Sequence, residues 1–205
     1  MGEQTARMKR RVVITGMDVV TPIGVGAENY WKAVCAGVSG VRRLTHFDTS
    51  GLPSQIGAYL DDAEQVERMR SSLRLGSEEP RGVVFALSAA RGAVESAGGE
   101  ACLKGPRAGI FIGTSGERLD LRTLGGVAYR ARGEGGTVAL SEFGRSYADH
   151  FSEGTLYRAL PQYVTGRVAA EYGIRGSGST LQTACTSSAQ AVGEAAAHQR
   201  PGVDA

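Results

Sequence analysis

The sequence predicts an α/β fold in which helices cover both faces of a mixed, mainly parallel β-sheet. Short apolar segments alternate along the chain with longer segments of helical periodicity, which favours α/β layers over a β-sandwich. Arg107 to Gly113 is predicted as a strand that is apolar on both faces, as expected in the middle of a covered sheet. With 205 residues, 41% hydrophobic and 21% charged, the chain suffices for one such domain or for one lobe of a larger one.

The first sixty residues predict two strands and one helix. Arg11 to Gly16 is a compact apolar strand that ends in glycine. A helix follows from about Ala27 to Ala36 and stops at Gly37. Val38 to Phe47 is predicted as a loop, and Ile56 to Leu60 as the second strand.

Two helices are predicted between residues 61 and 97. Asp61 to Arg74 is charged, and Glu64 and Arg68 stand one helical turn apart on what we interpret as a solvated face. The clearest helix runs from Pro80 to Ala97, because proline suits the first turn and Gly98-Gly99 ends it. Its apolar residues form one stripe, made of Val83, Leu87, Ala90, Val94 and Ala97.

The chemically distinctive stretch runs from Thr180 to Ser188. Its first residues predict a short strand, Cys185 follows, and Thr186 to Gln199 predicts a buried helix of mostly small residues. A cysteine at the start of a helix lies near the positive end of the helix dipole, which favours thiolate over thiol. Cys185 is therefore a candidate nucleophile, and the alternative is a buried structural cysteine, which is the commoner case.

Composition and spacing exclude several function classes. A net charge of +2 and the lack of a basic stripe with aromatics argue against a nucleic-acid partner. The three cysteines lack metal-ligand spacing and indicate a reducing compartment. The glycines after residue 16 lack dinucleotide-binding spacing. No apolar run reaches membrane-spanning length and residues 1–10 do not form a signal peptide, so we expect a soluble, cytoplasmic protein without a membrane partner.

The three histidines do not complete a hydrolase-type site. A cysteine nucleophile of that type needs a histidine base and a third, orienting group. None of His46, His150 and His198 takes that role by spacing, and each is interpreted as a surface or half-buried residue. Gly113 to Glu117 resembles a hydrolase nucleophile turn only in passing and is interpreted as the turn after the central strand.

Five segments together resemble the β-ketoacyl synthases, the condensing enzymes of fatty-acid and polyketide assembly. Thr180 to Ser188 is similar to the nucleophile motif of that family. The other matching segments, in the order of the family, are Arg11 to Gly24, Trp31 to Gly40 with Phe47-Asp48, Gly109 to Thr114, and Pro161 to Gly176. The resemblance implies a thiolase-like fold of two related halves, of which residues 1–205 would be the N-terminal lobe.

The resemblance also implies a mechanism. Cys185 would accept an acyl group from the phosphopantetheine arm of an acyl carrier protein, without a cofactor or metal of its own. Decarboxylation of a malonyl-type carrier would then give the carbanion that attacks this acyl group. In the family, two histidines and a glycine-rich turn of the second half complete the site, and the Cys185 N–H would be one oxyanion donor.

The missing second half leads to a prediction about assembly. A lone lobe would expose an edge of its sheet, so we expect a second chain to supply the C-terminal lobe, and the assembled unit to form a higher-order dimer. By resemblance, residues 115–160, interrupted by glycines and expected to be irregular, would line the substrate tunnel and a subunit contact. The other interpretation of residues 115–160 is a long surface excursion.

Three hypotheses stay open at this stage. The chain is a catalytic half of a split ketosynthase, a non-catalytic scaffold descended from one, or an isolated lobe of a longer enzyme. The cysteine argues against the inactive chain-length-factor relatives, which lack it. Of the other cysteines, Cys35 is expected in the core and Cys102 has no positive partner except Lys104, so Cys185 is the one expected to carry the acyl group.

Overall fold

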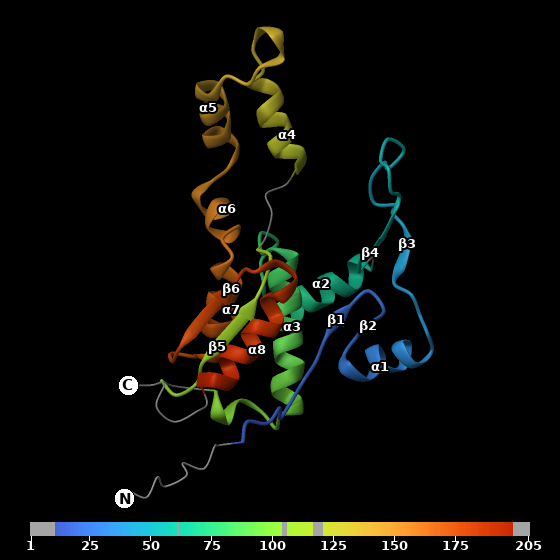
Figure 1. Ribbon diagram of the computed structural model, residues 1–205, viewed down its shortest axis with the longest axis vertical. Helices are drawn as coiled ribbons and strands as arrows, with labels where there is room; N and C mark the ends of the chain where they lie inside the picture. The colour runs from blue at the N-terminus through green and yellow to red at the C-terminus, as the bar shows by residue number, and fades with distance from the viewer. Residues whose placement is uncertain (1–10, 61, 104–105, 117–120, 199–205) are drawn as a thin grey trace, which may run out of the picture. The chain divides into compact units, whose positions relative to one another are not determined.

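The computed structural model describes residues 11–60, 62–103, 106–116 and 121–198, with helices and strands as labelled in Figure 1. The chain divides into two compact units. The first comprises Arg11–Lys104 together with Glu171–Gly173, and the described part of the second comprises residues 106–170 and 174–198. Each unit is described separately below.

The predicted strand at Arg11 to Gly16 is wrong. These residues are extended but pair with no described strand, and the side chains of Val13 and Ile14 are 72% and 76% exposed. A strand is held by hydrogen bonds to a neighbour, and apolar composition alone does not supply one. The first strands are instead β1 (Val20–Thr21) and β2 (Gly24–Val25), which form an antiparallel pair.

The next elements confirm the predicted helix and correct the predicted loop. Helix α1 (Ala27–Cys35) ends before Gly37, whose φ of 66° is a left-handed conformation that suits glycine. Strand β3 (Val41–Arg43) lies within the stretch predicted as loop and pairs antiparallel with β4 (Ile56–Ala58). The second predicted strand is thus confirmed in shorter form.

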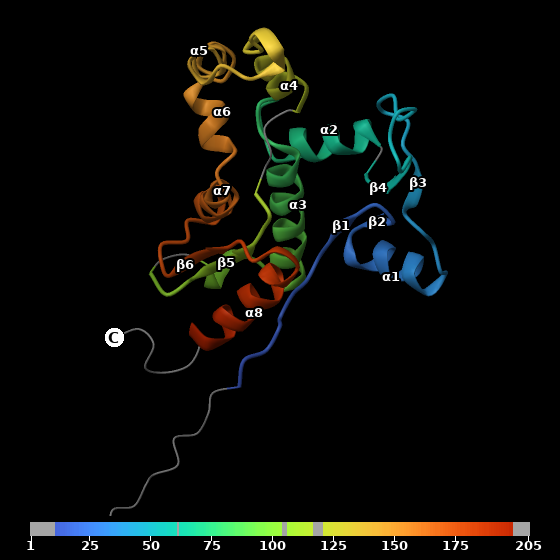
Figure 2. The ribbon, with the colours of Figure 1, turned by 45° about the horizontal axis from the view of Figure 1, so that its top comes forward.

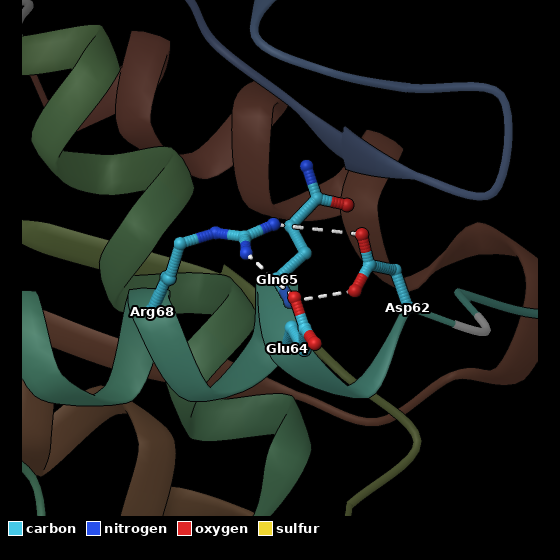
Figure 3. Close-up of polar contacts among 4 residues, drawn as sticks. All are labelled: Asp62, Glu64, Gln65 and Arg68. Atoms are coloured by element: carbon cyan, nitrogen blue, oxygen red, sulfur yellow. Dashed lines mark hydrogen bonds and ion pairs between the residues drawn. The ribbon is translucent and has the colours of Figure 1, made fainter.

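Helices α2 (Ala63–Ser72) and α3 (Arg81–Ser96) form the core of the first unit, as predicted. The Asp62 carboxylate caps α2 by accepting the Gln65 N–H at 2.8 Å, and Arg68 pairs with Glu64 at 3.4 Å on the solvated face (Figure 3). Pro80 precedes the first residue of α3. The buried apolar side chains between these helices are Val66, Met69, Leu73, Val83, Val84 and Leu87.

Three helices occupy most of residues 121–158, which corrects the prediction that the 115–160 stretch is irregular, while residues 131–139 form a turn between the first two helices. The helices are α4 (Leu121–Arg130), α5 (Leu140–His150) and α6 (Glu153–Arg158), and α4 packs against α5. Val127 is fully buried in α4, and Phe143 and Tyr147 stack at i, i+4 spacing in α5. Helical packing outweighs the glycine pair at 125–126 because the Gly125 position faces open space and costs only helix propensity.

The second unit is built around a parallel pair of strands, β5 (Ile110–Gly113) and β6 (Gly178–Leu181). Helix α7 (Gln162–Tyr172) precedes β6, and α8 (Ser187–His198) follows it and packs on both strands (Figure 2). A hydroxyl–hydroxyl contact of 2.6 Å between Thr165 of α7 and Thr180 of β6 joins helix to strand. The α/β class is confirmed, although the described strands form three separate pairs, one parallel and two antiparallel.

Candidate active site

The site begins where the two parallel strands end side by side. Gly113 of β5 lies opposite Leu181 of β6, and the Thr114 N–H donates to the Leu181 carbonyl at 2.9 Å. Beyond the strands, the Gln182 side-chain amide donates to the Ser115 carbonyl at 2.9 Å, which holds the two following turns together. Substrates of α/β proteins bind beyond the carboxyl ends of parallel strands, and the candidate nucleophile follows β6 at this edge.

Cys185 lies in a short 3₁₀ turn, Ala184–Thr186, directly before α8. The turn separates β6 from the helix, so the cysteine stands at the junction that the sequence predicts. Its side chain is exposed and forms no disulfide. A thiol in this position is accessible from solution and lies near the N-terminal end of α8, where the helix dipole favours negative charge.

The backbone before Cys185 is strained. Ala184 has a φ of 53°, and the only other non-glycine residue with positive φ in the described part is Arg74. The left-handed conformation costs an L-residue roughly 1–2 kcal/mol. Strain of this kind persists only where the surrounding structure enforces it, and it is common at active sites.

Hydrogen bonds from α8 and from the turn enforce this backbone. The Ser187 hydroxyl accepts the Thr183 N–H at 2.8 Å and donates to the Ala184 carbonyl at 2.8 Å. The Thr186 hydroxyl donates to the Thr183 carbonyl at 2.8 Å, and the Thr183 hydroxyl donates to the Gln190 side chain at 2.7 Å. Thr183 and the Ala184 carbonyl are therefore bonded to α8 or to the turn itself.

Close packing fixes the start of α8 against β5. A Cβ atom built on Gly113 would lie 2.3 Å from the backbone carbon of Ser187, so only glycine permits this approach. Ser187 and Ala191 are the buried residues of α8. The small residues of the helix thus serve the packing that the sequence suggests, on one side only.

The opposite side of α8 is exposed, so the helix is less deeply buried than its small residues predict. Ala189, Val192 and Gly193 are all exposed, and nothing lies within 4 Å of a Cβ built on Gly193. These three residues are called the open face of α8 below. Small and apolar residues on an open face leave the helix backbone accessible to a second packing element.

The other cysteines are placed differently. Cys35 is the last residue of α1 and is exposed, so the prediction of a core cysteine is wrong. The neighbouring α1 residues are exposed too, and the helix buries no residue. Cys102 ends a 3₁₀ turn (Glu100–Cys102), and its side chain, like Lys104, lies outside the described residues.

Each of the three histidines contacts residues other than Cys185. His46 packs on Tyr59 in the first unit, with ring centroids 4.6 Å apart. His150 Nε2 accepts from Arg130 at 2.7 Å, and its Nδ1–H donates to the Ser146 carbonyl. His198 is the last residue of α8 and packs on Phe111. The helix has 12 residues and is therefore about 18 Å long, which puts His198 at the end of the helix away from Cys185. The prediction of surface or half-buried histidines is confirmed.

A cavity of about 740 Å³ in the first unit is the rival site. Apolar residues including Val66 and Phe85 line it, together with Arg70 and Arg81. Both guanidinium groups already donate to backbone carbonyls, Arg70 to Gly76 and Glu79, and Arg81 to Leu60. The lining contains no cysteine, so Cys185 stays the candidate nucleophile.

The described residues hold no group of three or more histidine, cysteine or acidic side chains arranged to bind a metal ion. Among them, no helix is long and apolar enough to cross a membrane.

Comparisons with known proteins agree on one family. The profile of the β-ketoacyl synthase N-terminal domain matches residues 9–201. The chain is 36% identical over 200 residues to a putative polyketide β-ketoacyl synthase 1 of Streptomyces halstedii, covering 92% of this chain and 42% of that protein. It is 32% identical over 189 residues to 3-oxoacyl-acyl-carrier-protein synthase 2 of Coxiella burnetii, with the same coverage of 92% and 42%.

Solved structures give the same fold. The ishigamide ketosynthase/chain length factor aligns with a TM-score of 0.64 at 25% identity, over 85% of this chain and 40% of that one. AntDE:AntF, a type II polyketide acyl-carrier protein in complex with its ketosynthase bound to the hexaketide, aligns with a TM-score of 0.65 at 24% identity. That alignment covers 95% of this chain and 43% of the other. The chain therefore spans about two fifths of the proteins that it resembles.

Proposed function

The chain belongs to the β-ketoacyl synthase family, and from that premise we propose that it is the nucleophile-bearing half of a split β-ketoacyl-acyl-carrier-protein synthase. Residues 1–205 would form its N-terminal lobe. The observation that carries the proposal is the position of Cys185, exposed on a strained turn between a parallel strand and a helix. A scaffold protein would have no use for that strain.

The proposed chemistry is acyl transfer followed by condensation. The Cys185 thiolate attacks the carbonyl carbon of an acyl thioester on an acyl carrier protein, and the carrier thiolate leaves and takes up a proton. A malonyl-type thioester then loses carbon dioxide, and the resulting carbanion attacks the acyl carbonyl. That step forms the new carbon–carbon bond and releases the Cys185 thiolate. The acyl groups arrive on phosphopantetheine, and relatives of this family need no cofactor of their own.

A second lobe is proposed to supply what Cys185 lacks. Decarboxylation needs groups that stabilise the carbanion, and the contacts of the described histidines are with residues other than Cys185. The open face of α8 and the exposed apolar side chains of Val12, Val13 and Ile14 support the proposal, because water-exposed apolar surface of this kind marks an interaction site. The chain also spans only 42% of its Streptomyces halstedii relative.

The proposal is tested by co-expression with a candidate chain that carries the second lobe. We expect the two chains to co-purify in a one-to-one ratio and to convert acyl and malonyl carrier proteins into a β-ketoacyl product. Light scattering of the chain alone should show aggregates, because the exposed apolar surface has no cover.

Two results would contradict the proposal. A stable monomer of 21.4 kDa that binds no second lobe would argue against a split enzyme. A co-purified complex that never acylates or condenses would instead favour the non-catalytic scaffold.

Substitution of Gly193 by leucine provides a control, since a larger side chain on the open face of α8 should block assembly while leaving the separate chain folded.

A further inference from the structure

Ala184 is an unusual residue for a left-handed position. Glycine adopts positive φ without penalty, and asparagine or aspartate is tolerated there, whereas alanine has no polar side chain to offset the cost. The conformation of Ala184, with φ of 53°, must therefore be enforced by its neighbours. The hydrogen bonds around Ala184 indicate which neighbour contributes most to holding this conformation.

The Ser187 hydroxyl is placed to do so. It bridges the two residues before Cys185, accepting from the N–H of Thr183 and donating to the carbonyl of Ala184, both at 2.8 Å. Ser187 is only 3% exposed, so its hydroxyl is shielded from water. Loss of the hydroxyl would leave the Thr183 N–H without its acceptor and would remove one of two donors to the Ala184 carbonyl, which also accepts the Ser187 N–H. An unsatisfied group in a part-buried position is more costly than the loss of one exposed hydrogen bond.

The remaining hydrogen bonds of the turn are of a different kind. Those made by the hydroxyls of Thr183 and Thr186 lie among exposed side chains, where water competes for the same groups. The Ser187 hydroxyl and the Ser187 backbone N–H both donate to the Ala184 carbonyl. Gly113 holds Ser187 in place by allowing its backbone to pack against β5.

We infer that Ser187 is a positioning residue, whose hydroxyl holds Ala184 in the left-handed conformation and thereby places the Cys185 sulfur at the start of α8. The inference rests on the proposed role of Cys185 as nucleophile. Ser187 acts through the backbone and need not touch the substrate. Without its hydroxyl the turn relaxes, and the sulfur loses its position relative to the helix dipole.

The test is the alkylation rate of Cys185 by iodoacetamide, with exposed Cys35 in the same molecule as internal reference. Ser187→Ala should lower the ratio of the Cys185 rate to the Cys35 rate about tenfold, the effect of losing a buried hydrogen-bond partner. Ser188→Ala, at the exposed neighbouring serine, should leave the ratio unchanged. Ser187→Thr keeps the hydroxyl and should retain most of the ratio.

A second substitution separates positioning from general destabilisation. Ala184→Gly removes the cost of positive φ, so it should restore the ratio in the Ser187→Ala background. If Ser187→Ala unfolds the chain, the double variant should likewise recover the helical circular dichroism signal. A ratio unaffected by Ser187→Ala, or a defect that Ala184→Gly does not relieve, would overturn the inference.

The readout also separates this inference from the proposed function. Alkylation measures the position of the sulfur and requires neither an acyl carrier protein nor condensation. A failure of acyl transfer with the Ser187 effect intact would count against the proposed enzyme alone. Normal acyl transfer with no Ser187 effect would count against the positioning role alone.

Discussion

Cys35 and Cys185 are both exposed and both free, yet they occupy opposite ends of their helices. Cys35 ends α1, and the following Ala36 continues with ordinary right-handed backbone. Cys185 precedes α8, behind the left-handed Ala184 and a buried serine hydroxyl. Exposure therefore does not set the proposed nucleophile, Cys185, apart from Cys35. Helix polarity and the backbone structure around the sulfur do.

The glycines near the two cysteines show the same difference. Gly37 has nothing within 4 Å of a built Cβ, whereas a Cβ on Gly113 would clash with the backbone of Ser187. Gly37 serves only its own left-handed conformation, with φ of 66°. Gly113 serves the packing of α8 on β5, and thereby the position of Cys185.

The largest expected effect tests the difference between Gly113 and Gly37. Gly113→Ala should lower the free energy of unfolding of the second unit by about 3 kcal/mol, because α8 must move away from β5. Gly37→Ala should cost about 1 kcal/mol, the penalty of a left-handed alanine alone. Urea denaturation followed by circular dichroism measures both. Equal costs at the two positions would show that the tight contact is not a real constraint.

The next effect concerns the two thiols themselves. Cys185 should react with iodoacetamide roughly 3- to 30-fold faster than Cys35 at neutral pH, because one lies at the favourable end of a helix dipole and the other at the unfavourable end. Peptide mapping by mass spectrometry after timed alkylation gives both rates in one sample. A faster Cys35 would mean that helix polarity does not govern these thiols.

Salt provides a control for that measurement. Exposed charges are screened within about 8 Å at physiological ionic strength, so the ratio of the two rates should fall as salt is added. A ratio that does not respond to salt would point to access rather than electrostatics.

The smallest expected effect is a dependence of stability on alkaline pH that arises from Tyr172. Burial raises the pKa of Tyr172, only partly offset by Arg91. A raised pKa means that the folded state binds this proton more tightly, so the stabilisation is present below about pH 10, the ordinary tyrosine value, and is lost as the pH rises through the folded pKa. Tyr172→Phe should make unfolding less sensitive to alkaline pH. Unchanged sensitivity in that variant would assign the effect to another group.

Strong local signals explain what the sequence could predict. Helices α1, α3 and α8 follow from periodicity and from proline and glycine at their ends, and the Cys185 junction follows from a strand pattern beside a small-residue pattern. Strand β3 was missed because Val41–Arg43 is short and charged, and its pairing with β4 is a tertiary property. The segment before residue 17 failed as a strand for the same reason.

The finer features of the site were not readable from sequence. Alanine is not a residue that indicates positive φ, so the strain at Ala184 cannot be predicted from the sequence. A serine two positions after a cysteine is equally uninformative until its hydroxyl is seen to bridge Thr183 and Ala184. A single glycine at the end of a strand pattern could have suggested a close approach at Gly113, but not which element approaches.

The most direct measurement of the central claim is the location of a transferred acyl group. The chain, together with a co-purified second lobe, is incubated with an acyl-loaded carrier protein, digested, and mapped by mass spectrometry. We expect the acyl mass on the Cys185 peptide and no acyl mass in Cys185→Ala. The matched control, Cys35→Ala, should retain the acyl group on Cys185. Acylation on Cys35 or Cys102, or acylation that persists in Cys185→Ala, would contradict the account.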